Sequence, residues 1–403
     1  MRIAVVHPYP VHAKAVGGTT RVYELVRYLS ARHDVSVFTH ADGSETDDPE
    51  LARMGVHTQT FARPRPALRD RVRWWFDRTP YYVHRNVSAS LASAIGAADR
   101  DSPFDIVHLE LGYMAPAIDA VGPRAVRVLA EQEVMTLVVD RLRRVPWRRR
   151  TMYERLFVHT AAKIAAFDRR TLPGFDLVYG ITPQDRDQLR RTSGQPVAVL
   201  PHIVRMARFT ATSDDAPATV LFVGNFGHAP NVHGVRWFVD QVWPRIRAQV
   251  PVATFEIVGA GLSKALESQV SGPGVVVRGY ATDLAASYRR ASVVVTPIHS
   301  GGGMRGKVLE AFASAKALVS TSTGLDGIAA VPGTHCLAAD LPAAFADAVV
   351  GYLRTPPMRR AHGVAARALV AEHYDAPVVF RRLEADYEAA VAARRGSAAR
   401  SSA

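Results

Sequence analysis

Short apolar runs alternate with longer amphipathic stretches along the whole chain. Residues 2–7 form a continuous β-rich run, and apolar positions three and four apart follow at residues 18–31. The first pattern predicts a buried strand and the second a helix with one face in the core. Further strands are predicted at residues 35–39, 104–109, 126–130 and 177–181. Strands separated by helices indicate a mostly parallel sheet with helices on both faces.

The same alternation starts again after residue 210. A polar segment at 213–217 ends in proline and is typical of a linker, and residues 219–224 then read as a new buried strand. Further strands are predicted at residues 254–258, 275–278, 293–296 and 317–321, and helices at 232–249, 262–269, 283–291 and 307–315. We therefore predict an α/β protein with two doubly wound Rossmann-like domains, residues 1–204 and 205–375.

The C-terminal region predicts one more helix and a tail. Residues 376–393 are amphipathic, with an apolar stripe formed by Phe380, Leu383, Tyr387 and Val391. We expect this helix to pack back on the N-terminal domain. Residues 394–403 are rich in arginine, serine and alanine, and we expect them to be disordered.

Composition narrows the classes of protein that fit. The chain has 403 residues, of which 48% are hydrophobic, so it has ample material for two cores. Its single cysteine, Cys336, excludes an intrachain disulfide and any cluster of thiolate metal ligands. The first apolar run is too short for a secretory signal, and no stretch is long enough to span a membrane, so a cytoplasmic protein is expected. The net charge of +13 is spread along the chain without a nucleic-acid module, so no nucleic-acid partner is predicted.

The stretch SGGGMRGKVLEA at residues 300–311 carries the most specific chemistry. Its glycines nearly match a dinucleotide fingerprint, with Asp326 downstream, and Gly306-Lys307 nearly completes a P-loop. Val308 stands where a P-loop needs a hydroxyl for magnesium. Both motifs also belong after the first strand of a domain, whereas this loop comes late. A magnesium nucleotidase and a nicotinamide-dependent oxidoreductase are therefore disfavoured.

The residues after the glycines predict a nucleotide-diphosphate site. A helix that begins at the end of this loop presents unpaired N–H groups to an anion, and Arg305 and Lys307 add positive charge. Glu310 lies one turn further on and would repel a phosphate. A carboxylate at that place is suited to accepting hydrogen bonds from the two hydroxyls of a ribose.

Residues 294–328 resemble the donor-binding signature of the retaining glycosyltransferases of family four. The resemblance implies the GT-B fold, two Rossmann-like domains facing across a cleft. It also implies transfer of a sugar from a UDP- or GDP-sugar with retention of configuration and without a metal or cofactor. By the resemblance, Arg305, Lys307, Glu310 and Glu131 are the expected catalytic residues. The expected donor-binding residues are Gly17, Gly18, Gly224, Asn225, Arg278, Gly302, Gly303, Met304 and Leu309.

Three positions depart from the family pattern. Gly302 stands where many members carry a first glutamate, which usually contacts the sugar, and Asn225 replaces an arginine that clamps the diphosphate. Gln132 stands where a pocket histidine is often found. The missing glutamate keeps a second hypothesis open, a GT-B protein that binds a sugar nucleotide without transferring the sugar.

The acceptor is indicated only by composition. Residues 63–85 and 141–150 mix arginines with tryptophan and tyrosine, which suits an anionic glycan, a lipid-linked sugar or the inner face of a membrane. A secondary metabolite fits a glycosyltransferase equally well. The sequence leaves the sugar, the base, the linkage and the oligomeric state open.

Overall fold

The computed structural model describes residues 1–13, 17–41, 48–65, 76–144, 147, 151–211 and 218–401. The chain folds into two compact units. Unit 1 comprises Met1–His202 and Val379–Ala403, and unit 2 comprises Ile203–Val378. The polar segment 213–217, which the sequence predicts as a linker, lies outside the described residues.

Unit 1 is built on a seven-stranded sheet in the order β3-β2-β1-β4-β5-β6-β7, and every neighbouring pair is parallel. Ile3 in β1 lies opposite Val35 in β2 on one side and Ile106 in β4 on the other, so β1 is central. The strands are β1 (Arg2–His7), β2 (Asp34–Ala41), β3 (His57–Ala62), β4 (Ile106–Glu110), β5 (Val126–Glu131), β6 (Leu177–Gly180) and β7 (Ala198–Val199).

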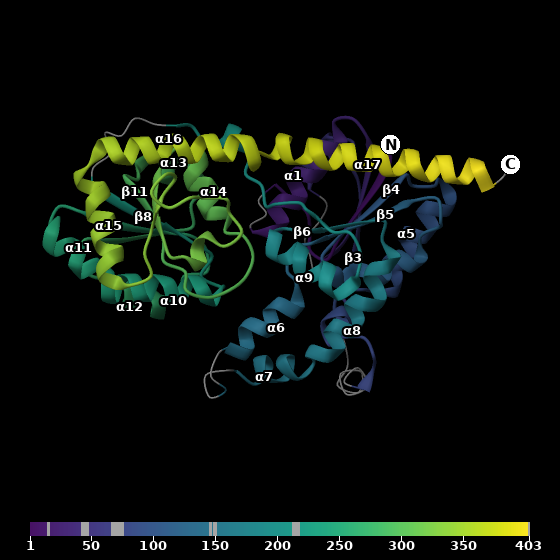
Figure 1. The fold of residues 1–403 in the computed structure, drawn as a ribbon, viewed down its shortest axis with the longest axis horizontal. Helices are drawn as coiled ribbons and strands as arrows, with labels where there is room; N and C mark the ends of the chain where they lie inside the picture. Colours follow the sequence, from purple (N-terminus) through teal and green to yellow (C-terminus); the bar gives the residue numbers. More distant parts are fainter. Residues whose placement is uncertain are drawn as a thin grey trace. The chain divides into compact units, whose positions relative to one another are not determined.

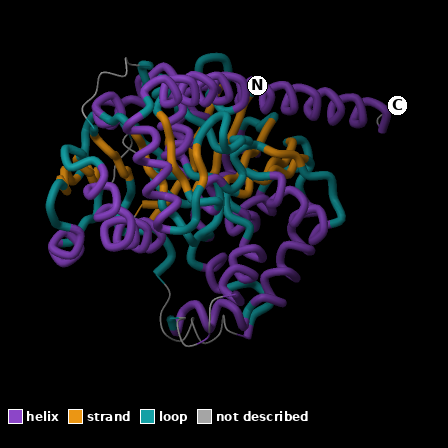
Figure 2. Tube along the Cα trace, turned by 60° about the vertical axis from the view of Figure 1, so that its left-hand side comes forward, coloured by secondary structure: helices purple, strands orange, loops and turns teal. Residues whose placement is uncertain are grey.

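Helices cover both faces of this sheet, and Figure 2 shows the strands enclosed by helices. They are α1 (Gly18–Ser30), α2 (Pro49–Arg53), α4 (Tyr81–His84), α5 (Ala89–Asp101), η1 (Gly112–Ala120), α6 (Met135–Arg144), α7 (Met152–His159), α8 (Ala161–Thr171), η3 (Leu172–Gly174), α9 (Pro183–Ser193) and α17 (Ala376–Ser401). Helices α6, α7 and α8 pack on one another and form a group of their own in Figure 1.

Unit 2 repeats the plan with a six-stranded parallel sheet in the order β10-β9-β8-β11-β12-β13. The strands are β8 (Thr219–Val223), β9 (Thr254–Val258), β10 (Val275–Gly279), β11 (Val293–Thr296), β12 (Ala317–Ser320) and β13 (Leu337–Ala338). The helices are η4 (Met206–Arg208), α10 (Ala229–Trp237), η5 (Phe238–Val242), α11 (Trp243–Gln249), α12 (Lys264–Val270), α13 (Leu284–Arg290), α14 (Gly306–Ala313), η6 (Thr323–Leu325), α15 (Pro342–Arg354) and α16 (Pro356–His373). The prediction of two α/β units with parallel sheets is confirmed.

The largest local difference from the sequence prediction lies in the first helix of unit 2. One helix was expected over residues 232–249, but α10 starts at Ala229 and is joined to α11 by a π-helical turn, η5. Pro244 lies in the first turn of α11 and has no N–H to donate, so a regular α-helical ladder cannot run through this point.

Three strands were not predicted, for reasons visible in their sequences. β3 reads HTQTFA and is largely exposed, so it lacks a buried apolar run. β7 and β13 are two-residue strands at the sheet edges. Edge strands of this kind are defined by their neighbours rather than by their own pattern.

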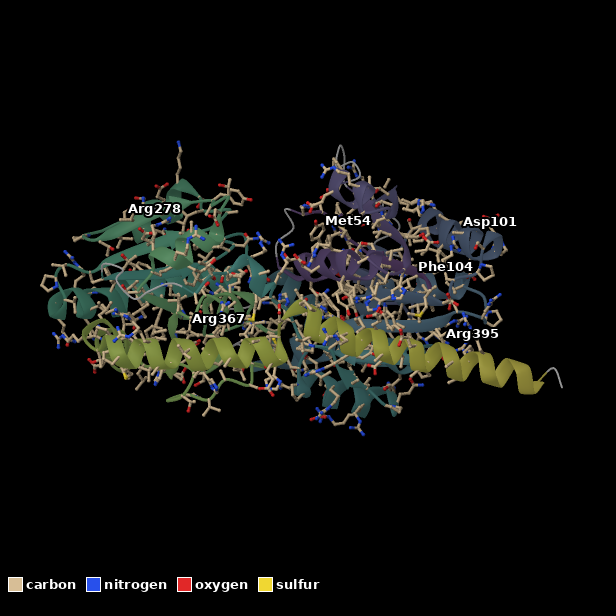
Figure 3. The ribbon with its side chains drawn as sticks, turned by 90° about the horizontal axis from the view of Figure 1, so that it is seen from above. Met54, Asp101, Phe104, Arg278, Arg367 and Arg395 are labelled. Atoms are coloured by element: carbon tan, nitrogen blue, oxygen red, sulfur yellow. The ribbon has the colours of Figure 1, made fainter. Side chains whose placement is uncertain are left out.

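The C-terminal helix α17 contributes to the core of unit 1. Phe380, Leu383, Tyr387 and Val391, the predicted apolar stripe, are all buried. Arg394 Nη1 donates to the carbonyl of Pro123, and Arg395 Nη2 donates to Asp105 Oδ1 at 2.7 Å. Figure 3 labels Arg395 close to Phe104, the neighbour of Asp105. Helix α17 extends to Ser401, past residue 393 where the sequence predicts its end, and these arginines bond the extension to unit 1.

No helix in the described part of the chain is both long and apolar enough to cross a membrane.

Candidate functional site

Each sheet has one point where the direction of strand addition reverses. In unit 2 the chain builds β8, β9 and β10 in one direction and then returns to place β11 on the other side of β8. In parallel sheets of this kind, the loops that follow the two strands at the reversal point, here β8 and β11, border the usual ligand site. They lead into α10 and α14, so the loop 297–305 lies where a parallel sheet normally binds its ligand.

Arg305 organises that loop. It is the N-cap of α14, and its guanidinium donates to the carbonyls of Gly303 at 2.7 Å and Gly301 at 3.0 Å. It also bonds the carbonyl of Gly302. Gly301 and Gly303 have φ of 95° and 74°. Residues that carry a side chain rarely adopt this backbone conformation. The predicted cation thus closes the glycine loop around its own side chain in this structure.

Lys307 is the cation that lies at the helix N-terminus itself. Its Nζ is 2.6 Å from Asn231 Oδ1 and 4.4 Å from the centre of the Phe222 ring. Burial and the nearby Arg305 lower the pKa of Lys307 to about 7. The first turn of α14 has no side-chain cap among the described residues. An anion bound there would meet open N–H groups and would restore the charge on Lys307.

Asn231 connects Lys307 to the loop after β8. Its Nδ2 donates to the carbonyl of Asn225 at 2.8 Å, while Asn225 Oδ1 accepts from the N–H of Gly227 at 2.9 Å. A Cβ on Gly224 would lie 3.2 Å from Asn231 Cγ, so the side chain packs directly on this turn. Asn225, which replaces the expected arginine, is used for turn geometry rather than for charge.

Glu310 faces the same region from α14. Its Oε2 accepts a hydrogen bond of 2.8 Å from the Tyr288 hydroxyl, and its Oε1 accepts none from the residues that the structure describes. Burial raises the pKa of Glu310, while the bonds from Tyr288 and the charge of Lys307 oppose that rise. One oxygen is thus held in place and the other is open to a donor from a ligand.

Backbone, rather than side chains, forms the rest of this edge. Gly259 N donates to the carbonyl of Gly279 at 2.7 Å, and a Cβ on Gly259 would lie 1.7 Å from the Gly224 oxygen. Glycines therefore stand at the ends of β8, β9 and β10, and at Gly259 there is no room for a side chain. The Nη2 of Arg278, a residue labelled in Figure 3, donates to Glu256 Oε1 at 2.7 Å, and half of the Arg278 side chain remains exposed.

The remaining predicted residues of unit 2 differ in accessibility. Gly302 and Gly303 are partly exposed in the loop. Leu309 is completely buried and Met304 is 7% exposed, so their side chains belong to the core beneath the loop.

Sequence reasoning missed Tyr288, which holds Glu310, and also Asn231 and His228. Asn231 holds Lys307, as described, and His228 is the N-cap of α10. Burial lowers the pKa of His228, and the charges of Arg305 and Lys307 lower it further. The motif HAPN at residues 228–231 is the available signal, since a proline in the first turn marks a helix start next to the glycine loop.

The reversal point of unit 1 lies between β1 and β4. Gly17 has φ 64° and is the N-cap of α1, whose first turn is likewise open, with no side chain of the described residues capping it. A Cβ on Gly18 would lie 2.1 Å from Gln132 Oε1. The predicted glycine turn and Gln132 are therefore in direct contact.

Glu131 is buried at the end of β5. Its Oε2 accepts from the N–H of Gly112 at 2.6 Å, and it lines a small cavity with Tyr113 and Asp168. Burial, and next the charge of Asp168, raise the pKa of Glu131 well above its usual value. Burial also raises the pKa of Asp168 to about 7. The carboxyl group of Glu131 is thus held by backbone in a site that favours its neutral form.

Within the described residues, no group of three or more histidine, cysteine or carboxylate side chains has the arrangement of a metal site.

Comparison with known proteins agrees with the architecture. Residues 217–355, about a third of the chain, match the family model described as Glycosyl transferases group 1. A Klebsiella pneumoniae protein, described as an uncharacterized 44.6 kDa protein in the cps region, is 26% identical over 169 residues. That match spans 40% of this chain and 44% of the relative, so less than half of the curated relative is covered.

Solved structures match over nearly the whole chain. Sucrose-phosphate synthase from Thermosynechococcus elongatus covers 97% of this chain and 99% of its own, with 17% identity and a TM-score of 0.72. Anabaena HepE, solved with UDP-glucose, covers 96% and 100%, with 12% identity and a TM-score of 0.67. A glycosyltransferase from Rickettsia africae covers 97% and 98%, with 13% identity and a TM-score of 0.68. The predicted GT-B fold is confirmed, and the family match with the fold supports a glycosyltransferase of the GT-B type.

Proposed function

We propose that the protein transfers a sugar from a nucleotide-diphosphate-sugar donor to an acceptor. The observation that carries this proposal is the arrangement at the start of α14. An uncapped helix N-terminus, the buried Lys307 held by Asn231 and the tethered Glu310 meet at the reversal point of the unit 2 sheet. Phosphate and ribose are the two parts of a nucleotide that need these partners.

In the proposed mechanism the protein binds and stabilises the leaving diphosphate. The N–H groups of α14 and the cation of Lys307 stabilise the negative charge that develops as the glycosidic bond to phosphate breaks. Arg305 keeps the loop in the shape that exposes those N–H groups, and Glu310 orients the ribose.

The finer properties follow the resemblance to retaining glycosyltransferases of family four. We propose that the acceptor hydroxyl attacks from the face that the diphosphate leaves, so that the anomeric configuration is retained. The leaving phosphate then takes the acceptor proton, and no metal is required. UDP-glucose is the first donor to test, because HepE, a structural neighbour, was solved with it; GDP-sugars are the alternative.

Glu131, which the sequence analysis expected to be catalytic, has a structural role in this proposal. Its carboxyl group is buried and bonded to the N–H of Gly112. We propose that it shapes the acceptor side of the site by fixing the start of η1, which follows β4, against the end of β5, rather than acting as a base.

The basic and aromatic part of unit 1 is proposed to meet a lipid-linked acceptor at an anionic membrane surface. Phe76, Met152 and Trp147 are exposed there, and the Arg155 guanidinium stacks on Trp147. Residues 66–75, 145–146 and 148–150 of the two stretches lie outside the described part of the chain. Cosedimentation with vesicles containing phosphatidylglycerol, compared with pure phosphatidylcholine, tests this point.

The decisive test of transfer is an activity screen. The full chain is incubated with UDP- and GDP-sugars and candidate acceptors, in the presence of EDTA. Release of nucleotide and an NMR spectrum of the anomeric proton report transfer and its stereochemistry. Binding of a sugar nucleotide without turnover on any acceptor would instead support the inactive binding protein that Gly302 leaves open.

A further inference from the structure

A groove of about 610 Å³ lies on one face of the unit 1 sheet, between strands β1 to β3 and helix α5. We call it the β3 groove. None of its residues belongs to the proposed nucleotide site or to the basic and aromatic stretches. Its volume is in the range of sites that hold small molecules. Its polar residues are Arg2, Asp34, Ser36, His57, Gln59 and Asp101.

The strand register explains why polar side chains gather on this face. Successive side chains of a strand point to opposite faces, so Asp34, Ser36 and Phe38 of β2 share one face. The register places His57 of β3 opposite Ser36, and Gln59 opposite Phe38. The faces of a parallel sheet are normally apolar and covered by helices. A polar strip with space beside it is therefore a departure that calls for an explanation.

Helix α5 forms the other wall of the β3 groove with small side chains. Ala94, Ala97 and Ala98 line the groove, because positions three and four apart share one face of a helix. Asp101, labelled in Figure 3, is the last residue of α5 and lies at the same wall. The wall therefore offers a flat apolar surface with a carboxylate at one end.

Most polar side chains of the β3 groove are free to bind a ligand. Those of Ser36, His57, Gln59 and Asp101 make no hydrogen bond or ion pair with the described residues. Ser36 is the most informative of them, because it is only 7% exposed and yet lines the groove. A buried hydroxyl group normally has a hydrogen-bond partner. Here the groove is the place from which a partner can come.

The charges of the β3 groove disfavour an anionic ligand. Arg2 Nε lies 3.5 Å from Asp34 Oδ2, and Arg2 Nη1 donates to the carbonyl of Ala98 at 3.2 Å, so this cation is used within the protein. The carboxylate of Asp101 would repel a phosphate. The free groups are a hydroxyl, an amide, an imidazole and a carboxylate, which together donate and accept hydrogen bonds. Sugar hydroxyls, which also donate and accept, match this set.

We propose that the β3 groove binds a neutral oligosaccharide. Its hydroxyl groups bond to Ser36, Gln59 and Asp101, and the C–H face of a sugar ring rests on the alanines of α5. The groove includes Asp34 and His57, the first residues of β2 and β3, whereas parallel sheets bind substrates beyond the last residues of their strands. It is thus a second site, and it depends neither on a nucleotide nor on sugar transfer.

The test measures binding of neutral trisaccharides of glucose, galactose, mannose or N-acetylglucosamine to the full chain, by saturation-transfer NMR and calorimetry. Ala97→Trp fills the groove from an exposed position of α5. Ala89→Trp makes the same change at an exposed position of α5 outside the groove. Ser36→Ala and Gln59→Ala each remove one hydrogen-bonding group. A hexaarginine peptide is the second probe, because the groove also carries carboxylates such as Asp101.

At least one trisaccharide is expected to bind the wild type, with equal affinity at low and high salt because the ligand is uncharged. Ala97→Trp should weaken this binding at least about tenfold, and Ala89→Trp should bind like the wild type. Ser36→Ala and Gln59→Ala should each weaken it about two- to tenfold, the cost of one neutral hydrogen bond.

Three results would overturn the inference. The first is that no trisaccharide binds at millimolar concentration. The second is binding that Ala97→Trp leaves unchanged, because the sugar is then held elsewhere. The third is salt-sensitive binding of hexaarginine alone, lost in Ala97→Trp and Asp101→Asn, which would assign the groove to a basic peptide. If Ser36→Ala does not fold, the exposed Gln59→Ala decides.

Titration with UDP and GDP separates this inference from the proposed function. Ala97→Trp should bind nucleotide like the wild type, because the β3 groove lies in unit 1 and the nucleotide site in unit 2. A wild type that binds a trisaccharide but no nucleotide would contradict the proposed function and leave the inference standing. A wild type that binds nucleotide but no trisaccharide would do the reverse.

Discussion

At the scale of single residues, the site depends on how cations are held rather than on how many there are. Arg305 and Lys307 are two positions apart, yet one closes the loop and the other lies at the helix N-terminus. Burial keeps the pKa of Lys307 near 7, so its charge changes within the range of ordinary assays. This residue should therefore couple nucleotide binding to protons.

Binding of UDP-glucose should weaken as pH rises above 7. The bound diphosphate favours the charged form of Lys307, so the pKa of Lys307 is higher in the complex than in the free protein. At a pH between these two pKa values, binding of the nucleotide is accompanied by uptake of a proton. Affinity should be level below pH 7 and fall above it, by at most about tenfold per pH unit. His228, whose pKa burial and the two cations lower, acts at lower pH.

Calorimetry from pH 6 to 9 checks this dependence, with Lys307→Arg as the comparison. Arginine stays charged over the whole range, so the slope above pH 7 should disappear in that variant. A slope that persists with Lys307→Arg would assign the titration to another group.

Asn231→Ala should lower the affinity for UDP-glucose about tenfold at pH 7, because a hydrogen bond to a charged group is lost. The loop after β8 also loses its bond from Asn231 to the carbonyl of Asn225. Asn225→Ala removes the turn contact with Gly227 without touching Lys307, and should have a smaller effect. Equal affinities for wild type and Asn231→Ala would show that Lys307 needs no partner.

The residue scale also shows where sequence reasoning stops. The glycines, the cations and Glu310 could be found because their spacing places them on one loop and one helix turn. The roles of Asn231 and Tyr288 could not, because they come from α10 and α13, and only the sheet order brings those helices to α14. The folding of Arg305 onto its own loop depends on glycine φ angles that the sequence allows but does not dictate.

At the scale of elements, glycines at strand ends let three backbones approach one another. Most strands were predictable because buried parallel strands are continuous apolar runs. The π-helical turn η5 and the short edge strands β7 and β13 were not, because tertiary neighbours define them. The close contact of Gly259 with Gly224 likewise becomes visible only when β8 and β9 are paired.

Gly259→Ala should destabilise unit 2 by at least about 2 kcal/mol, because the new Cβ meets the Gly224 oxygen and φ is 147°. Urea unfolding followed by circular dichroism measures the change. Gly272→Ala is the control, since no heavy atom lies within 4 Å of its Cβ position, and it should stay within about 0.5 kcal/mol of the wild type. A harmless Gly259→Ala would mean that the strand ends can separate freely.

At the scale of the whole molecule, the chain crosses from unit 1 to unit 2 and returns through α17. The apolar stripe of this helix was readable from its 3.6-residue period. Its extension beyond residue 393 was not, because it depends on contacts of Arg394 and Arg395 with segments far away in sequence. Figure 1 shows α17 running along unit 1 to the C terminus.

Phe380→Ala should lower the free energy of unfolding by about 3–5 kcal/mol, the usual cost of removing a buried phenylalanine. Phe380 is completely buried, and its ring lies 5.6 Å from that of Tyr28 on α1. Val364→Ala, at an exposed position of α16, should change stability little. A small effect of Phe380→Ala would show that α17 is not required for unit 1.

The central claim is that the loop and first turn of α14 bind the nucleotide of a sugar donor. Calorimetric titration with UDP and GDP of the wild type, Glu310→Ala and Arg305→Ala tests it most directly, with Glu267→Ala, an exposed carboxylate on α12, as the control. We expect the wild type and the control to bind one nucleotide equally, and each site variant to bind it about tenfold more weakly or worse. Wild-type affinity in both Glu310→Ala and Arg305→Ala would contradict the claim and place the site elsewhere.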